Sequence, residues 1–147
     1  MNLEQNKSTS RRLYDEVYNK GNLSSISQFV DSKFVGYDPS FPEPTKGLDG
    51  FRDFVTSIRT AFPDVSMKVE NIFGEGDHVC CRWSATGTHR GDFMGISATG
   101  KRFKITGTDT FRFSGGKIVE NYCNWDALGM FKSLGLIPEM ELESATS

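Results

Sequence analysis

Apolar residues recur with helical spacing in three stretches of the first 62 residues of this chain. The stretches cover about residues 8–19, 23–30 and 49–62. In each of them an apolar side chain returns every three or four positions, which predicts an amphipathic helix with one buried face. Gly21 can end the first helix in a left-handed conformation, and Pro63 stops the third.

After residue 64 the pattern changes to alternation of apolar and polar residues, which is typical of β-strands. We expect strands at about 65–69, 79–85, 103–113 and 117–125, with turns at 74–77 and 114–116 and a glycine-containing loop at 89–100. A short strand is also expected at 34–38, before prolines that exclude regular structure. A short C-terminal helix is expected from Asp126, with Leu128, Phe131 and Leu134 facing inward.

Helices that are segregated from hairpin-linked strands predict an α+β fold. About three N-terminal helices can cover only one face of the sheet, so we expect a curved antiparallel sheet wrapped around them, with one central pocket at the open end. A length of 147 residues fits a single domain spanning 1–147. Its core is expected at about 10–138, between a polar N-terminal tail and an acidic C-terminal tail.

The charge of the chain argues against binding to nucleic acids or to anionic lipids. Seventeen basic and 19 acidic residues give a net charge of −2, and the basic residues are scattered. No apolar run approaches the ~20 residues that span a bilayer, and the polar N-terminus does not read as a secretory signal. Three cysteines without a Cys-x-x-Cys spacing fit reduced thiols in the cytoplasm.

Twelve phenylalanines are many for a chain of this size. Aromatic side chains suit the walls of an apolar pocket, but they suit a filled aromatic core equally well. The composition leaves both alternatives open.

Asp109 breaks the pattern of its predicted strand. It has the parity of apolar neighbours such as Phe111, whereas the opposite face carries Arg, Lys and Thr. A carboxylate that points into an apolar interior is costly unless it is paired, hydrogen-bonded or protonated, and such positions often mark function. The alternative is a structural Asp at the sheet rim or bonded to a neighbouring Tyr or Arg.

A second polar cluster lies where the last strand passes into the C-terminal helix. Asn121, Asn124, Trp125 and Asp126 could face a pocket mouth there. The alternative for Asp126 is a helix N-cap, which is a common role for Asp.

Other candidate residues carry weaker signals. His89 lies in a turn-rich segment and could line a pocket, while Tyr37 and Asp38 end the first strand and could contribute a phenol and a carboxylate. Two distant histidines, His78 and His89, do not form a metal-site pattern. No nucleophile elbow, phosphate loop or triad spacing is present, so we expect neither a cofactor nor a metal.

Several motifs taken together resemble the SnoaL-like polyketide cyclases, also called ester cyclases. They are FPD at 62–64, GTHRG at 87–91, FMGI at 93–96, TGK at 99–101, DTFRF at 109–113, GKIVE at 116–120 and WDALG at 125–129. The resemblance covers about residues 10–138.

The resemblance implies a cystatin-like α+β cone, shared with ketosteroid isomerase and limonene epoxide hydrolase relatives. It implies a cofactor-free intramolecular aldol condensation of a polyketide methyl ester and a homodimer. The acid/base aspartate of the family corresponds to Asp126, and we expect Asp109 to act with it. The pocket for a small hydrophobic ligand is then expected to include Tyr37, Trp83, His89, Phe111, Asn121, Asn124 and Trp125.

Two departures from the family pattern leave other functions open. Tyr37 and Asn121 stand where many members have His. A non-catalytic binding protein for a hydrophobic metabolite is one alternative, and an epoxide hydrolase or double-bond isomerase in the same fold is another. The Asp-Arg-Asp set of the hydrolases is not evident in this sequence.

Overall fold

The computed structural model describes residues 2–138, so the acidic tail expected after Pro138 lies outside the described residues. Its helical segments are α1 (Leu3–Leu13), the π-helix η1 (Tyr14–Asn19), the 3₁₀ turn η2 (Leu23–Ser25), α2 (Ile26–Phe29), α3 (Gly47–Ala61) and α4 (Ala127–Ser133). Its strands are β1 (Val30–Tyr37), β2 (Thr45–Lys46), β3 (Ser66–Glu75), β4 (His78–Thr88), β5 (Arg102–Ser114) and β6 (Lys117–Trp125).

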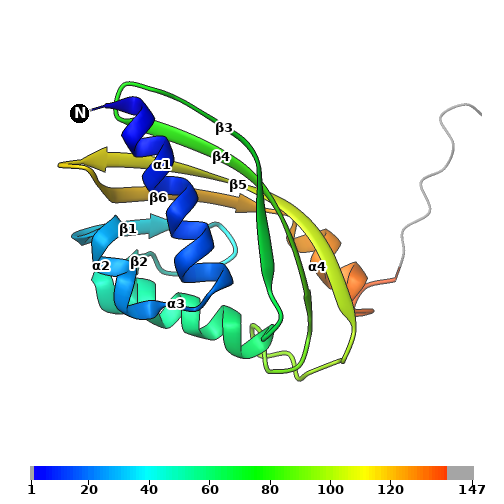
Figure 1. Ribbon diagram of the computed structural model, residues 1–147. Helices are drawn as coiled ribbons and strands as arrows, with labels where there is room; N and C mark the ends of the chain where they lie inside the picture. The colour runs from blue at the N-terminus through cyan, green and yellow to red at the C-terminus, as the bar shows by residue number, and fades with distance from the viewer. Residues whose placement is uncertain (1, 139–147) are drawn as a thin grey trace, which may run out of the picture.

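The six strands form one curved sheet in the order β2-β1-β6-β5-β4-β3. Helix α1 lies across one face of this sheet, α3 runs under β1 and β2, and α4 packs at the far end of β5 (Figure 1). The expected α+β architecture, with helices enclosed by a curved sheet, is therefore confirmed.

One pairing differs from the expectation of an antiparallel sheet. Strands β1 and β6 run parallel, with Gly36 opposite Asn121 and Tyr37 opposite Tyr122, so the sheet is mixed. A parallel pair needs a long connection. Here α3 and four strands, β2 to β5, supply it, and alternation along a single strand cannot reveal such a partner.

The first helix begins earlier than predicted. Asn2 caps it by accepting a hydrogen bond from the backbone N–H of Glu4 at 2.8 Å, which is the usual role of Asn at this position. Asn6 and Ser10 are buried on its inner face, and the hydroxyl of Ser10 donates to the carbonyl of Asn6. Polar residues therefore extend the buried face of this helix beyond the apolar pattern.

Two of the three residues expected to face inward from the C-terminal helix do so, since Leu134 is buried and Phe131 packs against the core. Leu128 is 45% exposed, so the prediction that it faces inward is wrong, whereas Met130 and Leu134 are buried. These two residues are four positions apart and therefore lie on one helix face, and Leu128 lies away from it.

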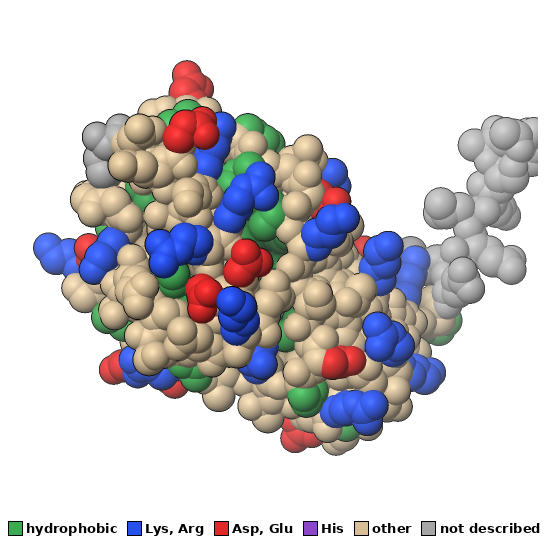
Figure 2. All heavy atoms as spheres, viewed as in Figure 1, with side chains coloured by type: hydrophobic (Ala, Val, Ile, Leu, Met, Phe, Trp, Pro, Cys, Tyr) green, Lys and Arg blue, Asp and Glu red, His purple; other side chains and the backbone are tan. Residues whose placement is uncertain are grey.

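On the side shown in Figure 2, the surface has charged side chains of both signs. Basic and acidic side chains alternate over the helices and the sheet edge. Among residues 2–138, no helix is both long enough and apolar enough to cross a membrane.

Candidate active site

A cavity of about 110 Å³ lies between the sheet and helix α3, and we call it the inner cavity. Its walls are mostly apolar and include Phe41, Phe51, Phe54, Phe103, Ile105 and Met130. An outer recess of about 310 Å³ adjoins it at the loop after β1. The two spaces share Tyr37, Asp38, Phe41, Glu43 and Cys123, which therefore form the mouth of the inner cavity.

Asp109 contributes a carboxyl group to this apolar space. Strand β5 turns it toward the helices, and the residue is only 6% exposed. Its Oδ2 accepts hydrogen bonds from the Tyr14 hydroxyl at 2.5 Å and from the Trp83 indole N–H at 3.1 Å, while its Oδ1 accepts from the Asn121 amide at 3.0 Å. The costly buried carboxyl inferred from the sequence is thus held by three donors.

Burial changes the proton affinity of the groups around this carboxyl. Desolvation raises the pKa of Asp109, although the hydrogen bonds that it accepts from Tyr14 and Asn121 act in the opposite direction. Desolvation also raises the pKa of Tyr14, and that of Cys81 to about 12. Tyr14 and Cys81 therefore stay protonated at neutral pH.

Two local features bring the donors to Asp109. The π-helical turn η1 starts at Tyr14, directly after α1, and π-turns widen a helix locally. Gly107 lies two residues before Asp109, and a Cβ built there would come within 2.3 Å of the Trp83 ring. Only glycine allows the indole to lie over β5 and reach the carboxyl.

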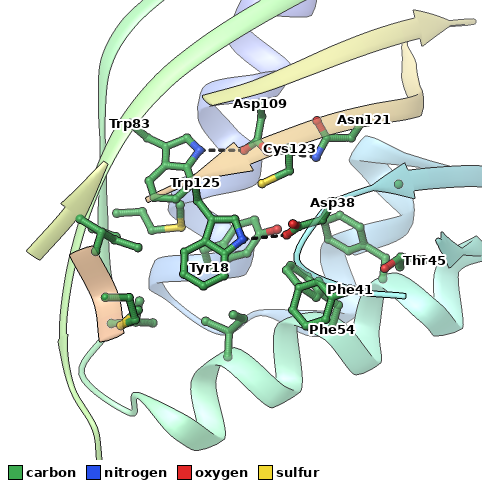
Figure 3. Close-up of a pocket in the computed structure, with 18 of the residues that line it drawn as sticks. Tyr18, Asp38, Phe41, Thr45, Phe54, Trp83, Asp109, Asn121, Cys123 and Trp125 are labelled. Carbon is green, nitrogen blue, oxygen red and sulfur yellow. Dashed lines mark hydrogen bonds between the residues drawn. The ribbon is translucent and has the colours of Figure 1, made fainter. Parts of the chain in front are cut away.

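A second carboxylate, Asp38, lies at the mouth of the inner cavity. Its Oδ2 accepts a hydrogen bond from the indole N–H of Trp125 at 2.9 Å, and its Oδ1 accepts from the backbone N–H of Ser40 at 2.8 Å. Figure 3 shows the two indole–carboxylate pairs on either side of Cys123.

The structure brings five of the predicted site residues together. These residues line the inner cavity: Tyr37, Trp83, Asp109, Asn121 and Trp125. Asn124 lies only in the outer recess. Tyr37 stacks on Tyr122 with ring centroids 5.0 Å apart, so its phenol forms part of the rim.

Two predicted pocket residues belong to the core instead. His89 is fully buried and packs against Phe62, and its Nδ1 contacts the hydroxyl of Thr99 at 3.0 Å. Phe111 packs against Tyr14 and does not reach the inner cavity. The alternation in β5 gives the correct face for Phe111, but helix α1 covers that part of the sheet.

Asp126 also lies outside the lining of the inner cavity. Its side chain is exposed and its Oδ1 accepts a hydrogen bond from the Gly129 N–H at 2.8 Å, so it is the N-cap of α4. The geometry of this residue matches the alternative that the sequence left open.

Residues not singled out from the sequence complete the site. Tyr14 and Tyr18 appear in the sequence only as apolar positions of a helix, and Cys123 as an inert thiol. A buried tyrosine hydroxyl needs a polar partner. The place of Tyr14 on the predicted buried helix face could therefore have indicated that it contacts a polar group of the site. No group of three or more His, Cys, Asp and Glu within residues 2–138 is arranged to hold a metal ion.

Comparisons with known proteins agree on one family. The model of the SnoaL-like polyketide cyclases matches residues 8–134. Aklanonic acid methyl ester cyclase DnrD of Streptomyces peucetius is 28% identical over 123 residues, which is 82% of this chain and 84% of the relative.

Solved structures show the same fold. IdmH of Streptomyces antibioticus, described as a candidate polyketide cyclase, is 30% identical with a TM-score of 0.77, over 89% of this chain and 99% of that chain. TsrD of Streptomyces laurentii is 22% identical with a TM-score of 0.84, over 93% of this chain and 99% of that chain.

Proposed function

Because this chain belongs to the SnoaL-like polyketide cyclase family, we propose that it closes a ring in a small polyketide-like ester or ketone bound in the inner cavity. The reaction is the ring-closing addition step of an intramolecular aldol reaction, without loss of water. A carbon next to one carbonyl loses a proton and becomes an enolate. The enolate carbon then forms a bond to the carbon of a second carbonyl group, and the oxygen of that second carbonyl gains a proton. The product is an isomer of the substrate, so the step needs no redox cofactor.

The observation that carries this proposal is the carboxyl of Asp109 inside an apolar cavity. Its raised pKa brings its proton exchange closer to neutral pH, where acid–base catalysis is most effective. The tyrosine and indole donors fix its orientation. The apolar walls exclude water from the enolate and favour a folded conformation of a flexible chain, which lowers the entropic barrier to ring closure.

The geometry favours Asp109 over Asp126 as the acid–base group. Asp109 faces the cavity, whereas Asp126 is exposed and satisfies a helix terminus. This assignment differs from the one that the family resemblance implies.

The test compares Asp109→Asn with Asp126→Asn in ring closure of a polyketide methyl ester. The first compound to test is aklanonic acid methyl ester, after the relative's name. We expect Asp109→Asn to lower kcat at least about 100-fold, since general acid–base groups contribute ~10²–10⁴. Asp126→Asn is expected to remain within about threefold of wild type, because a cap is worth only ~1 kcal/mol of folding stability.

The opposite order, with activity lost only in Asp126→Asn, would reassign the role to Asp126. The non-catalytic binding alternative predicts that the wild type is thermally stabilised by the ester and returns it unchanged. The homodimer implied by the resemblance and the cytoplasmic location inferred from the cysteines stay predictions.

A further inference from the structure

Asp38 lines the mouth of the cavity, as Glu43 does, and a mechanism that uses Asp109 alone leaves Asp38 without a role. Removing a carboxylate from bulk water is costly, and an apolar cavity of this size could be closed by a neutral side chain. Instead, Asp38 is aimed into the mouth by the Trp125 indole and the Ser40 backbone (Figure 3).

The strand order fixes how far apart the two carboxylates are. Asp109 is paired with Cys123 across β5 and β6, and Tyr37 is paired with Tyr122 across β1 and β6. Asp38 therefore follows β1 at the level of Cys123, with β6 between it and Asp109. Neighbouring strands are ~4.8 Å apart, so the two backbones are separated by roughly 10 Å. That gap accommodates the reacting part of a small molecule between the two side chains.

The surroundings of the two carboxyl groups differ in a way that suits different tasks. Asp109 is at the buried end, where desolvation favours its neutral form. Asp38 is half-buried at the mouth that opens to the outer recess, and it accepts hydrogen bonds from two N–H groups. Two titratable groups with such contrasting environments are the usual arrangement of an acid and a base in one site.

The hydrogen bonds to Asp109 favour one of its two oxygens for a proton, since Oδ2 accepts two of them and Oδ1 accepts one, from Asn121. Oδ2 already accepts hydrogen bonds from Tyr14 and Trp83, so a proton is best accommodated on Oδ1. Oδ1 faces Asn121, whose own Oδ1 is buried and has no partner among the described residues. A ligand oxygen placed beside Asn121 can therefore accept a hydrogen bond from the neutral carboxyl.

We propose that Asp38 is a further catalytic residue of this pocket, acting as the base at carbon while Asp109 acts as the acid at oxygen. This assignment rests on the proposed function. It also defines the substrate: an enolisable carbon lies toward the mouth, and the carbonyl that is attacked has its oxygen at the floor beside Asn121.

The step balances with these two groups. The Asp38 carboxylate takes the proton from carbon, the electron pair of that C–H bond forms the new C–C bond, and the carbonyl π pair takes the proton from Asp109. Asp38 is then protonated and Asp109 ionised. Asp38 at the mouth returns its proton to water, and Asp109 regains one before the next turnover.

The first experiment measures loss of the substrate's α-hydrogen in deuterated buffer by NMR, with the same polyketide methyl ester. We expect Asp38→Asn to slow exchange at least about 100-fold. Asp53→Asn is the charge-matched control, because Asp53 is exposed on α3 outside the cavity lining, and it should exchange at the wild-type rate. Thermal unfolding of each variant establishes that it is folded.

The second experiment needs no turnover and uses para-nitrophenolate, whose oxygen mimics the oxyanion. We expect Asp38→Asn to tighten its binding about tenfold, because a nearby like charge is removed. Asp109→Asn should weaken binding about tenfold, because the donor to oxygen is lost. Asp53→Asn should leave the affinity unchanged. The absorbance of the probe reports its binding and its ionisation together.

The outcomes separate the two proposals. Normal exchange in Asp38→Asn, with exchange lost in Asp109→Asn, would overturn the role of Asp38 and keep the proposed function. No exchange in wild type would sink the proposed function, and the phenolate titration would then decide alone. Affinity unchanged by Asp38→Asn, or no saturable binding to wild type, would overturn the placement of Asp38 next to the bound ligand.

Discussion

The hydroxyl of Tyr14 determines much of the chemistry available to Asp109. It donates to Oδ2 from a helix that lies 95 residues away in the sequence, in a region closed to bulk water. A donor of this kind stabilises the charged form of a carboxyl and lowers its pKa. Burial and Tyr14 therefore oppose each other at this one residue.

Tyr14→Phe is predicted to raise the pKa of Asp109 further, because the opposing hydrogen bond is removed while burial stays the same. The carboxyl C=O stretch of Asp109, followed by infrared titration and assigned with Asp109→Asn, measures this change. Tyr18→Phe is the matched control. Tyr18 stacks on Tyr14 at 5.8 Å but donates no hydrogen bond to Asp109 among the described residues. An equal shift in both variants would contradict the role given to the Tyr14 hydroxyl.

Helix α4 depends on the side chain of its N-cap residue, Asp126. The helix has only seven residues, too few to be stable without packing and a cap. It is held by two buried residues, Met130 and Leu134, and by the bond from the Gly129 N–H to Asp126. The inner cavity also uses Met130 as part of its wall.

Asp126→Ala is predicted to lower the free energy of unfolding by about 1 kcal/mol, since a helix N-terminus loses its cap. Urea denaturation measures the change. Asp126→Ser is the control, because serine caps nearly as well and should recover most of the stability. If Asp126→Ala unfolds like the wild type, the hydrogen bond to Gly129 contributes nothing to stability.

The elements of this fold were predictable from local pattern, but the contacts between them were not. Asp109 stood out because it is a charged residue on the apolar face of its predicted strand. The sequence of that one strand is enough to show this. The pair of Asp38 and Trp125 joins residues 87 positions apart through the parallel contact of β1 and β6. The periodicity within β1 or β6 does not show which strand pairs with it. The sequence could therefore name Asp38 as a candidate residue but could not show that it lies beside Trp125.

The stability of the whole molecule should depend on pH through Asp109. The carboxyl titrates near 3.8 when exposed, and burial raises its pKa in the folded protein. As pH rises above 3.8, the unfolded chain releases this proton first, so the folded state holds more protons than the unfolded one. The free energy of unfolding then falls with rising pH until the folded pKa is passed. The raised pKa of Asp109 thus lowers the free energy of unfolding at pH values above 3.8.

Asp109→Asn removes this titration, so its stability relative to wild type is predicted to increase from pH 4 to pH 7. Chemical denaturation across that range measures the difference. Asp64 and Glu70 have lowered pKa values, due to hydrogen bonds from Thr88 and Ser84 respectively, and they stabilise the fold as pH rises. They are present in both proteins, so subtracting one pH profile from the other cancels their effect. A difference that stays flat over this range would mean that Asp109 titrates alike in both states, and its burial would then have no bearing on acid–base chemistry.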